Sequence, residues 1–327
     1  MRRRDFAKLI LGGAAVYPLR AHAQRSPDKM PRIGVLLPGT PASFSIRAKA
    51  LADGLGELGR VEGKTIQIEW KWANDRVDVL PDLAADFVRS RVDAIVTGGT
   101  PAARALKAAT QSIPIVVAIM ADPIAAGLVA NLARPGGNLT GFSIVAPELG
   151  TKRLQLLKEI APQISSVAVL LNGRNPQAQI EMREVSAAVS AMGLQVTAID
   201  ISTGSRLEDA FAAMNKFAQA LIVLTDPVLF SERKLTVELA NANRLPAVYP
   251  FQGYVEDGGL MSYGPSDTDL FRRAAGYVDR ILKGANPGEL PVEQPTKFDL
   301  CVNVNAARTL GIRIPELFLA RADKVIE

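Results

Sequence analysis

Hydroxyl, amide and acidic side chains follow several apolar runs of this sequence. At residues 97–101 an apolar run gives way to Thr-Gly-Gly-Thr-Pro, and an alanine-rich helical pattern begins at once. The first N–H groups of a helix lack carbonyl partners and attract negative charge. We therefore expect Gly99 and Thr100 to hold an anionic group such as a carboxylate. The alternative is that Thr100 only caps its own helix, with Pro101 at the first helical position.

Five further polar residues occupy comparable places. Asp122 and Asp226 each precede a proline, where a carboxylate can accept an ammonium group or simply begin a turn. Thr40 and Asn172 offer a hydroxyl and an amide after two other apolar runs. Thr140 is expected where the chain crosses between two halves of the fold, beside any cleft, unless it is only a turn hydroxyl. These residue types suit the binding of a small charged molecule.

Aromatic residues make up only 6% of the chain, yet four of them fall in or near expected loops or crossovers. They are Phe44, Phe142, Phe251 and Tyr263. A ring in such a place either stacks on a ligand or packs in the core. We include Phe44 and Phe251 in the predicted binding site.

The scarcity of histidine and cysteine in the sequence excludes several kinds of catalytic and metal site. The single histidine, His22, lies in an N-terminal segment that we expect to be removed, and the single cysteine, Cys301, lies in an apolar run. The remaining chain cannot form a Ser-His-Asp or Cys-His catalytic group, or a metal site built from histidines or cysteines. It also lacks a Walker A loop and a G-x-G-x-x-G fingerprint. We therefore expect no metal, no cofactor and no catalytic residue.

The first 23 residues have the pattern of an export signal. A basic start precedes a short apolar stretch at 9–16 and an Ala-x-Ala cleavage site at 21–23. Residues 3–8 also fit the twin-arginine pattern, with a Sec signal as the alternative. This segment carries +4 of the net charge of +5. The rest of the chain is near neutral, so we expect no affinity for nucleic acid. The export pattern has no cysteine at its cleavage site, so we expect a soluble periplasmic protein without a lipid anchor.

The elements that must position these residues alternate regularly. Apolar runs of strand length are separated by helical patterns of 10–15 residues, which is typical of βαβ units on a parallel sheet. The cycle starts twice, because residues 31–41 and 165–176 share an apolar run, a glycine-containing turn and a proline. We predict an α/β fold of two similar doubly wound parallel-sheet lobes. A lone helical pattern at 267–285, between extended connectors, indicates several crossings between the lobes.

Many segments of the chain resemble the substrate-binding proteins of an ABC transporter family. Among them are GLGELGRVEGKTIQIEW, VDAIVTGGTPAARALKAAT, PGGNLTGFS and LPVEQPTKFDLCVNVNAARTLGI. This family is a branch of the type I periplasmic binding proteins, and it includes tryptophan-binding members. The resemblance implies a two-lobed fold with a three-crossover hinge and a cleft that closes on a small molecule.

The resemblance also implies where the lobes begin and end. One lobe would take residues 30–142 plus 263–290, and the other 143–262 plus 291–327. The loops that face the ligand would be those around Thr40, Thr100, Asp122, Thr140, Asn172 and Asp226. The protein would act as a monomer, with the ABC permease and ATPase as separate chains.

The sequence does not identify the ligand and leaves two alternative functions open. Among ligand classes, we expect an amino acid, including an aromatic one, or a small carboxylate ahead of a peptide or a purine-like molecule. An enzyme on the same fold would have to assemble its site from Asp, Glu, Lys, Tyr or Cys301. The effector domain of a transcription regulator would need a helix-turn-helix segment at the N-terminus, where this chain has the export pattern.

Overall fold

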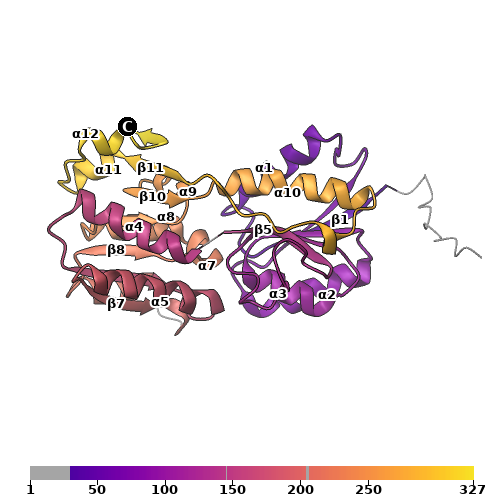
Figure 1. Cartoon of the computed structure of the whole chain (residues 1–327), viewed down its shortest axis with the longest axis horizontal. Helices are drawn as coiled ribbons and strands as arrows, with labels where there is room; N and C mark the ends of the chain where they lie inside the picture. The colour runs from indigo at the N-terminus through magenta and orange to yellow at the C-terminus, as the bar shows by residue number, and fades with distance from the viewer. Residues whose placement is uncertain (1–29, 145, 204–205) are drawn as a thin grey trace, which may run out of the picture.

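The computed structural model describes residues 30–144, 146–203 and 206–327, so the predicted export signal lies outside the described residues. The described chain forms two lobes side by side (Figure 1). Each lobe has a β-sheet at its centre with helices on both faces, and the predicted pair of doubly wound α/β lobes is confirmed.

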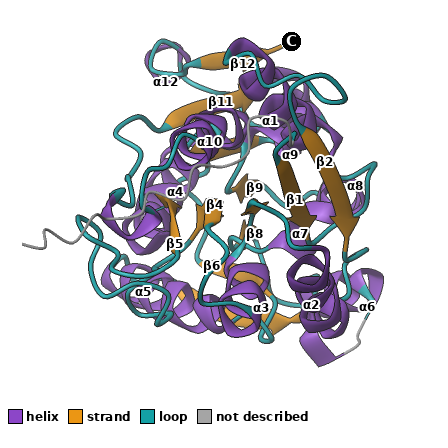
Figure 2. Ribbon diagram, turned by 90° about the vertical axis from the view of Figure 1, so that its right-hand side faces the viewer, coloured by secondary structure: helices purple, strands orange, loops and turns teal. Residues whose placement is uncertain are grey.

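The first lobe is built on a parallel sheet in the order β2-β1-β3-β4-β5. Its strands β1, β3 and β4 are almost continuous runs of Val, Ile, Leu and Ala, because helices cover both faces of the sheet. Helices α2 and α3 cover one face, and α1 and α10 cover the other (Figure 2). The strands are β1 (Arg32–Leu37), β2 (Gln67–Trp72), β3 (Ala94–Thr97), β4 (Ile115–Met120) and β5 (Leu139–Ser143). The helices are α1 (Ser45–Glu57), α2 (Leu80–Ser90), α3 (Thr100–Ala109) and α10 (Asp267–Leu282).

The second lobe repeats this arrangement. Its strands follow the order β7-β6-β8-β9-β10, extended by β11, which is antiparallel to β10, and by β12. The strands are β6 (Ser166–Leu171), β7 (Gln195–Asp200), β8 (Ala220–Val223), β9 (Ala247–Tyr249), β10 (Met261–Gly264), β11 (Asp299–Asn303) and β12 (Lys324–Ile326). The helices are α4 (Ala146–Ile160), α5 (Pro176–Ala191), α6 (Leu207–Met214), α7 (Pro227–Ser231), α8 (Arg233–Ala242), α9 (Gln252–Glu256), α11 (Val304–Thr309) and α12 (Glu316–Leu319).

The chain passes between the lobes three times: after β5, after β10 and before β11. Sheet pairing extends one to three residues beyond each of the three predicted boundaries, and at the first of them β5 includes Ser143. Tyr263 and Gly264 still belong to β10 of the second lobe, so the second passage follows residue 264. Glu293 still bonds through its backbone to Gly141 and Ser143 of the first lobe, so the third passage follows residue 293. Within the described residues, no helix is long and apolar enough to cross a membrane.

Candidate functional site

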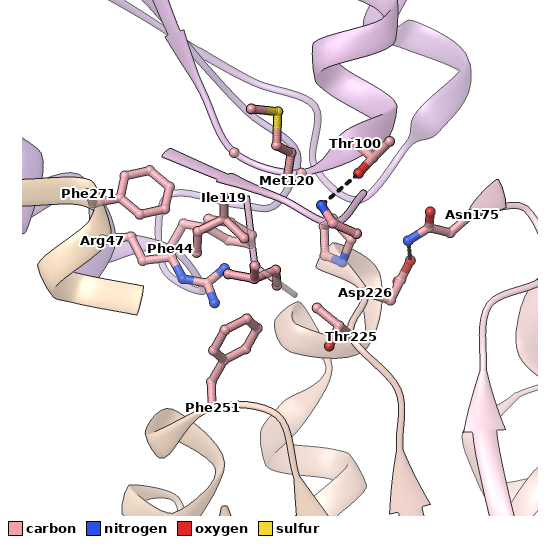
Figure 3. Close-up of a pocket in the computed structure, with 15 residues that line it drawn as sticks. Phe44, Arg47, Thr100, Ile119, Met120, Asn175, Thr225, Asp226, Phe251 and Phe271 are labelled. Atoms are coloured by element: carbon pink, nitrogen blue, oxygen red, sulfur yellow. Dashed lines mark hydrogen bonds between the residues drawn. The ribbon is translucent and has the colours of Figure 1, made fainter. Parts of the chain in front are cut away.

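In each lobe the strand order reverses beside its first strand, and the loops at these two points face each other. The reversal falls between β1 and β3 in the first lobe and between β6 and β8 in the second. In open α/β sheets, ligands bind beyond the carboxyl ends of the strands at such a point. Here the loops after β1, β3, β6 and β8 contribute to a cavity between the lobes, with about 430 Å³ of empty space that includes space open to solvent (Figure 3). We call it the interlobe cavity.

Both lobes supply its walls, and most of the lining is apolar. The loops named above contribute Phe44, Gly98, Gly99, Thr100, Asn175, Thr225, Asp226 and Pro227. The other lining residues are Arg47, Ile119, Met120, Ala121, Ile144, Phe251 and Phe271. Small-molecule sites combine an apolar wall with a few well-placed polar groups in this way. Asp226 is the one carboxylate and Arg47 the one basic side chain among these lining residues.

The anion-binding end of the predicted site lies one residue away from where the sequence pattern places it. Gly99, not Thr100, is the N-cap of α3, and Thr100 is the first helical residue. Gly99 has a φ of 94°, a backbone conformation that glycine adopts without strain. The Thr100 hydroxyl instead accepts a hydrogen bond of 3.3 Å from the Ala121 N–H, which joins the loops after β3 and β4. The prediction of Thr100 as N-cap is therefore wrong, although both residues line the cavity.

Asp226 is the N-cap of α7 and is 3% exposed. Its carboxylate accepts hydrogen bonds from the Val228 and Leu229 N–H groups, and from the side-chain amides of Asn172 and Asn175. Burial raises the pKa of Asp226, and these hydrogen bonds oppose the shift. Its described partners are neutral, so a buried carboxylate beside the cavity has hydrogen bonds but no cation.

A buried ion pair supports the loop that carries Asp226. Arg153 of α4 donates to Glu181 of α5 at 3.0 Å and to the Tyr263 carbonyl at 2.8 Å. The other oxygen of Glu181 accepts from the Thr225 N–H at 3.1 Å. Burial raises the pKa of Glu181 and lowers that of Arg153, and the attraction between the two opposes both shifts. The pair ties the cavity loop to segments that adjoin the first and second crossovers.

Arg47 of α1 enters the cavity from the first lobe and is only 4% exposed. Its Nε donates to Asp267, the first residue of α10, at 2.7 Å. The guanidinium carbon lies 3.4 Å from the centre of the Phe230 ring and 5.0 Å from that of Phe251, both in the second lobe. Burial lowers the pKa of Arg47, and Asp267 opposes that shift. The Arg47 side chain therefore reaches from the first lobe to aromatic rings of the second.

Other contacts show that the lobes are closed on each other. The hydroxyls of Ser43 and Ser231 lie 3.1 Å apart across the lobes, and Arg233 of α8 donates to the Ser43 carbonyl at 3.0 Å. Gly99 faces Pro227 so closely that an added Cβ would lie 2.8 Å from the proline Cγ. Glycine at this position thus permits the close approach of the second lobe.

The structure brings five of the nine predicted site residues together around the cavity: Phe44, Gly99, Thr100, Asp226 and Phe251. A sixth, Asn172, lies behind them, bonded to Asp226, and lines a neighbouring cavity of about 320 Å³ between the lobes.

The other three predicted residues do not line the interlobe cavity. Thr40 bonds with Ser43 inside its own loop. Asp122 accepts from the Ile124 and Ala125 N–H groups and so stabilises its own turn. Thr140 is buried in β5, where its hydroxyl donates to the Leu290 carbonyl. Each of these polar side chains finds its partner within the first lobe.

Two other aromatic candidates also lie away from the cavity. Phe142 packs edge-to-face on Tyr277, with ring centres 5.1 Å apart, and Tyr263 lies beside Phe298.

Sequence reasoning missed Arg47, although a signal for it was present. Its helix buries Arg47, Ala50, Leu51, Gly54 and Leu55, which recur at helical spacing on one face. A charged residue on the apolar face of an amphipathic helix requires a partner or a function. Asn175 and Phe271 carried no comparable signal, because amides and phenylalanines are common in turns and cores.

Comparisons with known proteins agree with this geometry. Residues 33–326 match the family described as ABC transporter substrate binding protein. A tyrosine-binding protein from Clostridioides difficile is 26% identical over 285 residues, covering 87% of this chain and 82% of that protein.

Two solved structures differ in how closely they match. An ABC domain from Streptococcus pneumonia in complex with L-Trp is 28% identical, covers 91% of this chain and 100% of its own, and has a TM-score of 0.85. A ligand-free, open substrate-binding protein from Clostridium difficile is 25% identical, covers 90% and 99%, and has a TM-score of 0.64. The better match to the ligand-bound structure agrees with the contacts between the lobes. The chain belongs to the ABC transporter substrate-binding protein family, with the type I periplasmic binding protein fold.

Proposed function

We propose that this protein is the exported substrate-binding component of an ABC importer and that it captures a free amino acid in the interlobe cavity. The observation that carries the proposal is the composition of that cavity. Apolar walls from both lobes enclose the N-terminus of α3, which favours an anion, and the buried carboxylate of Asp226, which favours a cation. An amino acid carries both charges and an apolar side chain.

The charged groups of such a ligand have different partners. Its carboxylate would accept hydrogen bonds at the start of α3, where Gly99 and Thr100 line the cavity and no side chain caps the helix. Its ammonium group would pair with Asp226, whose described partners are all neutral. The side chain would lie among Phe44, Phe251 and their apolar neighbours. The relatives named for L-Trp and for tyrosine support an aromatic side chain.

Capture would follow from closure of the lobes. A ligand that contacts α3 in the first lobe and Asp226 in the second binds the closed form better than the open form, and so shifts the population toward it. The closed protein would then deliver the ligand to a membrane permease, coupled to a separate ATPase. The export pattern at residues 1–23 supports a periplasmic place for this step.

The test uses residues 24–327, unfolded and refolded to remove any bound ligand. Each L-amino acid is added in a thermal-unfolding screen, and hits are measured by calorimetry beside their D-enantiomers. A ligand at one hundred times its Kd stabilises the folded state by about 2.7 kcal/mol. We expect a selective shift for one or a few L-amino acids.

A matched pair of variants locates the site. Asp226→Asn should weaken binding at least tenfold, while Asp122→Asn should leave it unchanged, since both residues precede a proline but only Asp226 lines the cavity. Equal effects of the two variants would rule out the proposed ammonium site. No shift with any amino acid would refute amino-acid capture.

A further inference from the structure

A guanidinium donor of Arg47 in the interlobe cavity has no hydrogen-bond partner among the described residues. The Nη2 atom of Arg47 is inaccessible to solvent and donates to no described atom, while Nε of the same side chain is bonded to Asp267 at 2.7 Å. The ring of Phe230 lies against the guanidinium plane. That contact uses the face of the guanidinium and leaves its N–H edge free. A buried donor without a partner destabilises the protein, so a ligand that supplies an acceptor gains affinity.

Arg47 and Asp226 enter the cavity from opposite sides (Figure 3). Phe44 and Phe251 flank the guanidinium, with ring centres 4.8 Å and 5.0 Å from its central carbon. On the proposed function, the ammonium group lies at Asp226 and the carboxylate at the start of α3. The free donor of Arg47 would then meet the far end of the ligand side chain, between two aromatic rings.

We propose that Arg47 is a specificity-determining residue, whose Nη2 donates to a hydrogen-bond acceptor at the distal end of the ligand's side chain. This inference rests on the proposed function. The acceptor is a neutral oxygen, the phenolic hydroxyl of a tyrosine-like side chain. Asp267 already balances the charge of Arg47, so a distal carboxylate would bury a negative charge without a counterion.

L-Tyrosine and L-phenylalanine are the probes, because they differ only in a distal oxygen. The Kd of each is measured by calorimetry for the wild type and for Arg47→Met, which keeps an unbranched side chain and removes the donors. We expect the wild type to bind tyrosine at least tenfold more tightly than phenylalanine. In Arg47→Met that ratio should fall to about one.

Arg233→Met is the control for a purely structural effect. Arg233 also packs on Phe230, at 4.6 Å, and bonds across the lobes to Ser43, but it does not line the interlobe cavity. Its loss should weaken both amino acids by the same factor and leave their ratio unchanged. Thermal unfolding of both variants without ligand checks that they fold.

The outcomes separate the inference from the function on which it rests. If Arg47→Met lowers both affinities equally, Arg47 only holds the lobes closed and the inference is wrong. If the wild type binds another amino acid but does not prefer tyrosine to phenylalanine, the inference fails and the proposed function stands. Binding of no amino acid at all would overturn the proposed function itself.

Discussion

Replacing Gly99 with alanine should weaken ligand binding by an amount that the structure allows us to divide in two. Gly99 has a φ of 94°, and its added Cβ would lie 2.8 Å from Pro227 Cγ of the other lobe. The backbone strain belongs to the first lobe and is present whether the lobes are open or closed. The collision with Pro227 exists only when they are closed.

The two effects have different sizes and different observables. An alanine in this backbone region costs about 1–3 kcal/mol, which lowers the Tm of the ligand-free protein. Carbon atoms in contact lie about 3.5–4.0 Å apart, so Pro227 must move by roughly 1 Å. Overpacking of this kind costs about 1–3 kcal/mol, and here it destabilises only the closed state. Such a change in the closing equilibrium weakens binding about 5- to 150-fold.

The assay is a double-mutant cycle on ligand affinity, with Gly99→Ala, Pro227→Ala and the pair together. Pro227→Ala removes the atom that the new Cβ meets, so the pair should bind more tightly than Gly99→Ala alone while keeping its lowered Tm. Small-angle scattering in the presence of ligand should show Gly99→Ala more open than the wild type. If Gly99→Ala weakens binding equally with and without Pro227, contact between these residues does not control closure.

Three further predictions concern other buried or polar groups. Arg153→Met and Glu181→Leu should each destabilise the protein by about 3–5 kcal/mol in urea unfolding, because each leaves a buried charge unpaired, and the double variant should recover most of that loss. The affinity for the amino acid should rise as the pH increases from about 4 past the pKa of Asp226, which burial raises. Only the ionised carboxylate attracts an ammonium group, so calorimetry on Asp226→Asn should show no such rise. Asp122→Ala should cost about 1 kcal/mol of stability with an unchanged Kd; a weaker Kd would place Asp122 in the binding site after all.

Sequence reasoning predicted the fold better than the site. Buried strands and amphipathic helices have periods that are visible locally, so the alternation and its second start predicted the two lobes. It also placed Gly99, Thr100 and Asp226 at strand ends, where parallel topology brings loops together. It could not choose between Asp226 and Asp122, which share the Asp-Pro context. Only the strand order puts the loop after β8 at a reversal point and the loop after β4 away from one.

The sequence by itself determined the class of the protein, because the apolar periodicities specify the α/β lobes and the scarcity of histidine and cysteine excludes whole classes of chemistry. The tertiary structure decided which polar groups remain available to a ligand. Thr140 and Asp122 form hydrogen bonds with backbone groups of the first lobe. Arg47 instead keeps one donor free beside Phe251, which lies more than 200 positions away in the chain. The apolar face of α1 indicates that Arg47 needs a partner or a function, but which of its donors stays free depends on contacts between distant segments, which local patterns do not specify.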